Sequence, residues 1–163
     1  MKRSRTSMLG LIAAASITLA SMNAWADWQN SIPASAGHTV VSSEATCMNF
    51  QDFSNQVSNT GCGGTVRWVV PLTLHWLSVG SPVSQTVRAT AVGGGTGPTC
   101  RLAVRSGSDG SMLLGSLVTV GGDTILGGRT MSTTTGDNAL VQCDLAQGGK
   151  SLASIRWHGT GSN

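Results

Sequence analysis

The chain has 163 residues, of which 10% are charged and 4% are aromatic, with 22 glycines and no tyrosine. Its formal charge is +3, but Lys2, Arg3 and Arg5 supply that excess, so residues 27–163 carry seven basic and seven acidic side chains. This balance, with dispersed basic residues and no cluster beside aromatic ones, excludes the strong electrostatic signature of nucleic-acid binding, and we expect no nucleic-acid partner.

The first 26 residues have the pattern of a Sec-type signal peptide. A basic start is followed by an apolar run from Met8 to Ala20 and then by the small-x-small sequence Ala24-Trp25-Ala26. We expect cleavage after Ala26, so that residues 1–26 are the signal and residues 27–163 form one domain. The apolar run is short for a membrane span, and we predict a protein that is periplasmic or secreted and not transmembrane.

The stretch from Trp28 to Thr65 is the least regular part of the mature chain. It predicts one or two strands, near 39–42 and 46–50, and a loop tied by cysteines. Two apolar segments follow, 66–70 and 72–77, which we interpret as two strands joined by a bend or an edge, because Pro71 lies between them. The segment 111–120 is apolar on both faces, which favours a central strand.

Four segments show period-two alternation of apolar and polar residues, as half-buried strands do. They are 85–91, 99–105, 140–145 and 151–158. In the last of them, Ala153, Ile155 and Trp157 share one side. Glycine-rich turns separate the segments, and Asp109-Gly110 is a strong hairpin signal. The chain is therefore predicted to be all-β, an antiparallel β-sandwich or jelly-roll-like fold of about eight to ten short strands.

Four cysteines allow three disulfide pairings. Cys100 and Cys143 lie on the apolar sides of alternating strands and can face each other inside a sandwich. Cys47 and Cys62 lie close together in the irregular part. We therefore favour Cys47–Cys62 and Cys100–Cys143. Metal binding is the alternative, but the chain has no Cys-x-x-Cys pair and no histidine at a matching spacing, so we predict no metal ligands.

No catalytic or cofactor-binding set can be assigned from the residues. His38, His75 and His158 lack a Gly-x-Ser-x-Gly partner motif and are interpreted as structural or surface histidines. Three aspartates lie beside glycines, which favours turn capping over a carboxylate pair for glycoside hydrolysis or a calcium site. These are Asp109, Asp123 and Asp137.

The tryptophans divide into two groups. Trp68, Trp76 and Trp157 share parity with apolar neighbours and are predicted to be in the core. Trp28, near the start of the mature chain, is the candidate for an exposed binding aromatic.

Several short motifs occur one after another along the chain. They are Cys47, Val70-Pro71-Leu72, Cys100-Arg101-Leu102, Asp109-Gly110, Val141-Gln142-Cys143-Asp144-Leu145 and Gly148-Gly149. In this order the chain resembles a diffuse group of uncharacterised exported bacterial proteins, small disulfide-bonded β-sandwiches. It departs from that group in having Val70 where the group places a cysteine before the proline. The resemblance implies an exported sandwich and supplies no activity.

These observations predict an exported, non-enzymatic binding or structural module, with an unknown protein or glycan at the cell surface as partner and no cofactor. Two alternatives stay open. One is a secreted hydrolase acting on polysaccharide or peptide, which requires two carboxylates or a Ser-His pair in one cleft. The other is a pilus-type surface subunit that completes its fold with a neighbour's strand.

Overall fold

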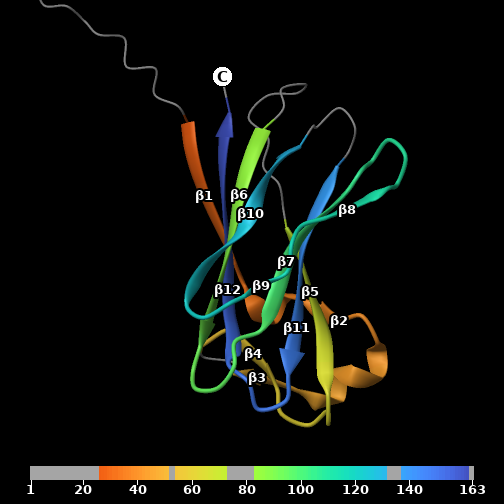
Figure 1. Ribbon diagram of the computed structural model, residues 1–163, viewed down its shortest axis with the longest axis vertical. Coiled ribbons are helices and arrows are strands. Elements are labelled where there is room, and N and C mark those ends of the chain that lie inside the picture. Colours follow the sequence, from red (N-terminus) through yellow and green to blue (C-terminus); the bar gives the residue numbers. More distant parts are fainter. Residues whose placement is uncertain (1–25, 52–53, 73–82, 132–136, 162–163) are drawn as a thin grey trace, which may run out of the picture.

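The computed structural model describes residues 26–51, 54–72, 83–131 and 137–161, and Figure 1 shows their arrangement. These residues form two antiparallel six-stranded sheets. Buried residues of the two sheets form one hydrophobic cluster between them, so the predicted all-β sandwich is confirmed. The described residues contain twelve strands, slightly more than the predicted eight to ten, and two short 3-10 helices. In the part of the chain described, no helix has the length and apolar character needed to cross a membrane.

The first sheet, sheet A, has the order β10-β6-β12-β4-β3, with β1 also paired to β12. Its strands are β1 (Ala26–Pro33), β3 (Met48–Gln51), β4 (Gln56–Asn59), β6 (Val83–Val92), β10 (Asp123–Met131) and β12 (Ser151–Gly161). Because β6 occupies one edge of β12, the strands β1 and β4 share the other: β4 pairs at Leu152 and β1 pairs from Ser154 onward.

The second sheet, sheet B, has the order β2-β5-β11-β7-β8, with β9 also paired to β7. Its strands are β2 (His38–Thr39), β5 (Thr65–Leu72), β7 (Thr99–Arg105), β8 (Met112–Leu114), β9 (Val118–Thr119) and β11 (Asn138–Ala146). The helices η1 (Ala34–Ala36) and η2 (Ser42–Cys47) lie between the first strands of the chain.

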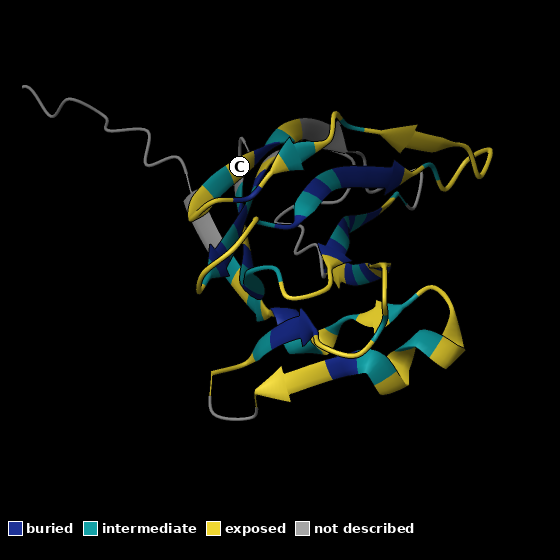
Figure 2. Cartoon of the chain, turned by 60° about the horizontal axis from the view of Figure 1, so that its bottom comes forward, coloured by how far each residue is buried: buried dark blue, intermediate teal, exposed yellow. Residues whose placement is uncertain are grey.

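The alternation of the strands builds the core. Figure 2 shows buried and exposed residues in succession along them, and each sheet turns its buried side toward the other. All four segments with period-two alternation are strands, in β6, β7, β11 and β12. Trp68 and Trp157 are buried, as predicted. The indole N–H of Trp68 donates to the carbonyl of Ala34 at 2.8 Å, which fixes η1 against the core. Trp76 and His75 lie outside the described residues.

At the start of β12, the side chains that face the core are not the ones that simple alternation predicts. Leu152 is fully buried together with Ile155 and Trp157, whereas Ala153 is only half-buried. The pairing of β12 with β6 shifts between Leu152 and Ser154. Such an irregularity inserts one residue and changes which side chains face the core, so simple alternation fails there.

The predicted central strand at 111–120 is wrong. That segment forms two short strands, β8 and β9, both paired only with β7 and separated at Gly115, whose N–H donates to the carbonyl of Leu102. Its apolar side chains lie at the edge of sheet B, where Leu113 is about half exposed (51%). Apolar residues on both faces of this segment therefore reflect an edge and not burial on two sides.

The predicted break at Pro71 is also wrong. Strand β5 runs through Pro71, which pairs with Leu140 of β11. On its other side, β2 covers only Trp68 and Val69, so Pro71 lies beyond the paired part of that edge, where a proline is tolerated. Residues 73–77 of the second predicted strand lie outside the described residues.

The irregular region up to Thr65 contains more structure than predicted. It holds β1, β2, β3 and β4, where one or two strands were expected near 39–42 and 46–50. Strand β10 was not predicted. Its alternation is interrupted by a register shift between Ile125 and Gly127, and Gly127 has a φ of 124°, which favours glycine. The predicted hairpin at Asp109-Gly110 is confirmed, because it joins the paired strands β7 and β8.

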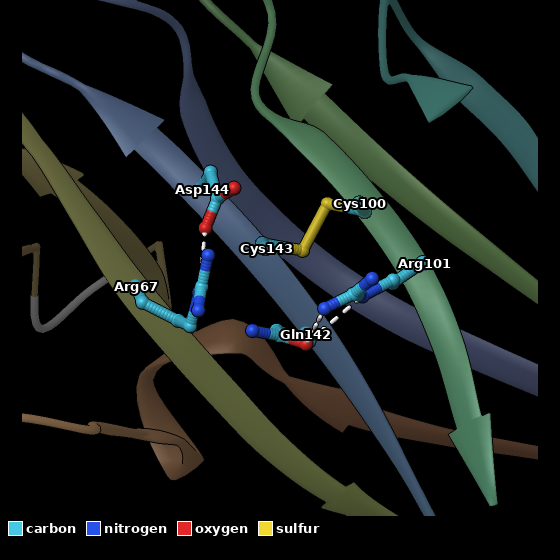
Figure 3. Close-up of polar contacts among 6 residues, drawn as sticks. All are labelled: Arg67, Cys100, Arg101, Gln142, Cys143 and Asp144. Atoms are coloured by element: carbon cyan, nitrogen blue, oxygen red, sulfur yellow. Dashed lines mark hydrogen bonds and ion pairs between the residues drawn. A yellow bond between two sulfur atoms is a disulfide. The ribbon is translucent and has the colours of Figure 1, made fainter. Parts of the chain in front are cut away.

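Both favoured disulfides are present, Cys47–Cys62 and Cys100–Cys143. Cys100 and Cys143 lie directly opposite each other on β7 and β11, with their Cα atoms 4.0 Å apart. The bridge therefore joins neighbouring strands of sheet B, as Figure 3 shows, and does not cross between the sheets as the sandwich argument had suggested.

Buried Asn59 connects the other disulfide loop to the sandwich. Its side-chain amide donates to the carbonyls of Gly64 and Leu145, at 2.8 and 3.1 Å, and its Oδ1 accepts from the Cys62 N–H at 3.1 Å. These bonds satisfy a polar group that would otherwise be costly to bury. The disulfide closes this loop, and the bond from Asn59 to Leu145 holds it to β11.

We predict that the two disulfides contribute unequally to stability. Replacing Cys100 and Cys143 by alanine should lower the free energy of unfolding by about 4 kcal/mol, and replacing Cys47 and Cys62 by about 3 kcal/mol, because the closed loops span 43 and 15 residues. Urea unfolding monitored by tryptophan fluorescence measures both values. Equal stability of the oxidised protein and the Cys100/Cys143 double variant would contradict this account.

Candidate functional site

An open hollow of about 630 Å³ lies on sheet A. Four strands contribute to it: β1, β6, β10 and β12. Its lining residues are predominantly polar: Asn30, Ser31, Thr86, Arg88, Asp123, Arg156, Trp157 and His158. Arg88 and Arg156 each lie between two buried residues of their strands, so their side chains leave sheet A on the side away from the core. The hollow is therefore on the outer face of the sandwich.

Two arginines converge on one carboxylate in this hollow. The register of β6 and β12 places Arg88 directly opposite Arg156. The Oδ2 atom of Asp123 lies 2.8 Å from Nη2 of Arg88 and 2.8 Å from Nη2 of Arg156, and Nε of Arg88 donates to the same oxygen at 3.0 Å. The three side chains are 38% to 49% exposed, so solvent reaches the group.

The two cations determine the electrostatics of this carboxylate. Hydrogen bonds from Arg88 and then Arg156 hold the pKa of Asp123 below its ordinary value. The bond to Asp123 in turn raises the pKa of Arg88. All three groups are therefore charged at neutral pH, and together they carry one net positive charge.

The outer face of sheet B offers a useful comparison (Figure 3). There Arg67 and Asp144 are opposite each other on β5 and β11 and form a one-to-one ion pair, with Nε 3.0 Å from Oδ1. Arg101 donates to the side-chain carbonyl of Gln142 at 2.8 and 3.0 Å. Each of these arginines has its own acceptor, whereas Arg88 and Arg156 share one oxygen.

The predicted site residues are dispersed over the fold. His38 lies in β2 of sheet B and is exposed, whereas His158 lines the hollow on sheet A. Asp109 accepts from the Ser111 N–H and Asp137 from the Gly107 N–H, at 3.0 and 3.2 Å. The Asp109 contact is the expected turn capping within its own turn, and that of Asp137 joins two separate loops. Asp123 instead belongs to the arginine cluster.

Trp28 lies in β1, where its backbone pairs with Gly159 of β12. Its side chain is outside the described part of the structure, so its exposure stays a prediction. Within the residues described, no group of three or more histidine, cysteine, aspartate or glutamate side chains is placed to hold a metal ion.

Sequence reasoning missed the Arg88–Asp123–Arg156 cluster. The alternation placed Arg88 and Arg156 on the polar sides of their strands, but it carries no information on which strands are neighbours. Asp123 was assigned to a turn because it follows Gly121 and Gly122. The signal that could have found the cluster is a polar-side arginine on two strands that pair in register.

A second surface feature is an apolar edge, which we define as Met112, Leu113, Leu114, Leu117 and Ile125, each about half exposed. Four of these residues lie in or shortly after the edge strand β8 of sheet B, and Ile125 lies in β10, the edge strand of sheet A that contacts β7. A groove of about 370 Å³ at this place is lined by Leu102, Gly115, Ser116, Val118, Ile125, Leu126, Gly127 and Gly128.

No family model, no curated protein and no solved structure matches this chain.

We predict that the carboxyl group of Asp123 titrates below 3.8, its ordinary value. Arg88→Gln should raise this pKa more than Arg156→Gln, because the hydrogen bond from Arg88 is the larger cause. A carboxylate whose pKa is lower in the folded than in the unfolded protein stabilises the fold at pH values above its unfolded pKa. This stabilisation is lost as the pH falls through the folded pKa. Carboxyl ¹³C shifts measured against pH give the pKa in each variant.

Arg67→Gln, on the other sheet, is the matched control and should leave the titration of Asp123 unchanged. A midpoint for Asp123 at or above its ordinary value in the unmodified protein would show that the two arginines do not engage it in solution.

Proposed function

We propose that this chain is an exported, non-enzymatic binding module whose binding surface is the hollow on the outer face of sheet A. The observation that carries the proposal is the convergence of Arg88, Arg156 and Asp123 in a hollow that also presents amide and hydroxyl groups. A rigid sheet holds these groups, and such preorganisation lowers the entropic cost of binding.

The lining chemistry suits a hydroxyl-rich ligand, namely a glycan at the cell surface. Asn30, Ser31 and Thr86 can donate and accept hydrogen bonds, and the arginines are donors only. A sugar offers both donors and acceptors at short spacing. Seven of the eight residues that line the hollow have polar side chains, which favours such a ligand over a hydrophobic one.

Export by a signal peptide removed after Ala26 is part of the proposal. One observation supports it. All four cysteines are paired in disulfides, which persist in oxidising compartments such as the periplasm or the cell exterior.

The contacts of Asp123 argue against the hydrolase alternative. Ser31 and His158 both line the hollow, but a triad also needs an acid to orient the histidine. Asp123 is the one carboxylate among the described lining residues, and two arginines already hold its Oδ2 atom. A glycosidase of the common type needs two carboxyl groups flanking the bond to be cleaved.

We expect the exported, oxidised protein to be retained on at least one immobilised polysaccharide from a set that includes peptidoglycan, dextran and polygalacturonate. Ser31→Trp should abolish retention, because Ser31 is exposed and a tryptophan there fills the hollow. Thr65→Trp is the control, since Thr65 is an exposed strand residue on sheet B. Retention of both variants alike would refute the site, and release of shortened glycan would refute the non-enzymatic role.

A second candidate is a pilus-type structural subunit, which the apolar edge favours. Unpaired edge strands offer backbone hydrogen-bonding groups to another chain, and exposed apolar side chains add to such pairing. Leu102 and Leu126 at the groove are each only 3% exposed, so the core is already covered there. An association at this edge would therefore add a strand to a completed fold.

If the chain is such a subunit, light scattering should show a mass that rises with protein concentration. Leu114→Lys should keep the protein monomeric, because it places a charge on the edge strand. Thr65→Lys on β5, which is exposed but lies on a strand that is paired on both sides, is the control and should still associate. A constant monomer mass for the unmodified protein at every concentration would remove this candidate.

A further inference from the structure

We propose that the ligand of the hollow is an acidic glycan, and that its anionic group is bound between the guanidinium groups of Arg88 and Arg156. This inference rests on the proposed binding function and specifies its ligand class. It adds that the site selects a negatively charged ligand, which the proposed binding function by itself does not specify.

Two positive charges, those of Arg88 and Arg156, lie opposite each other on paired strands. Directly opposite residues on paired antiparallel strands are close neighbours, and like charges at such positions destabilise the sheet. Arg88 and Arg156 occupy such positions. Asp123 offsets part of this repulsion, but one carboxylate faces two cations, and a net positive charge remains. An anion from the ligand would complete the neutralisation.

Arg88 and Arg156 keep N–H donors that do not contact Asp123. A guanidinium group carries five N–H donors. The contacts to Asp123 involve Nε and Nη2 of Arg88 and Nη2 of Arg156. Further N–H groups on each arginine therefore remain in a hollow that is open to solvent. Their planar geometry suits a carboxylate or sulfate, which can accept two parallel hydrogen bonds.

The described residues of the hollow offer no exposed tryptophan, tyrosine or phenylalanine ring on which a sugar could stack. Sugar rings without charge are commonly held by stacking on an exposed aromatic side chain. Among the described lining residues, the aromatic ring other than that of His158 is Trp157, which is 4% exposed and buried in the core. Charge and hydrogen bonds are therefore the means of recognition that these residues offer, which favours an acidic glycan over a neutral one.

The experiment compares three polysaccharides with the exported, oxidised protein by isothermal titration calorimetry. Polygalacturonate carries carboxylates, dextran sulfate carries sulfates, and dextran is neutral. We expect one or both acidic polymers to bind at least about tenfold more tightly than dextran, since hydrogen bonds to charged groups are worth that much. The preference between the two acidic polymers identifies the anionic group. Binding should weaken as sodium chloride is added, because salt screens exposed charges.

The variants test the placement of the anion. Arg88→Gln and Arg156→Gln should each weaken binding of the preferred acidic polymer by about tenfold. Arg67→Gln removes the arginine of the ion pair on sheet B and should leave the affinity unchanged. Asp123→Asn removes the competing carboxylate and should strengthen binding, a gain that a purely structural role for Asp123 would not produce. Circular dichroism verifies that each variant is folded.

The outcomes separate the two proposals. If dextran binds as tightly as the acidic polymers, the anionic ligand is refuted while the binding module stands. If none of the three polymers nor peptidoglycan binds, the binding function fails and this inference fails with it. If Arg67→Gln weakens binding as much as Arg156→Gln, the attraction is general to the surface and the assigned site is wrong.

Discussion

The pairing register of β6 with β12 is the constraint on which the rest of the structure depends. It places the buried residues of both strands against sheet B, and the same register places Arg88 and Arg156 side by side on the opposite face. Because side chains alternate along a strand, a slip of β12 by one residue would expose its core residues and bury Arg156. The hydrophobic core and the polar hollow are therefore two consequences of a single alignment, and neither can change alone.

The disulfides act on other parts of the fold than this register. Cys100–Cys143 joins the two middle strands of sheet B, on the far side of the core from the hollow. Cys47–Cys62 closes the loop that η2, β3 and β4 form, and Asn59 connects that loop to β11. Oxidation thus reinforces sheet B and the β3–β4 end of sheet A. None of the four cysteines is among the residues that line the hollow.

Sequence patterns predicted local features and failed where the result depended on neighbours in space. Alternation located β7 to the residue, because every second side chain is buried by the opposite sheet. The same logic misjudged 111–120, because apolar residues on both faces fit a central strand and an exposed edge equally well. It also misplaced Ala153, since a bulge arises from how β12 pairs with β6. The arginine cluster required the strand order, which no local pattern contains.

The arginines of the two outer faces differ in how they share their acceptors. An exposed one-to-one pair such as Arg67–Asp144 contributes little to stability, and it leaves no charge unmatched. The cluster on sheet A differs because two arginines share one acceptor. One carboxylate therefore faces two cations, and one positive charge stays without a matching carboxylate among the described lining residues. In the proposed function, the anionic group of a ligand would offset that charge.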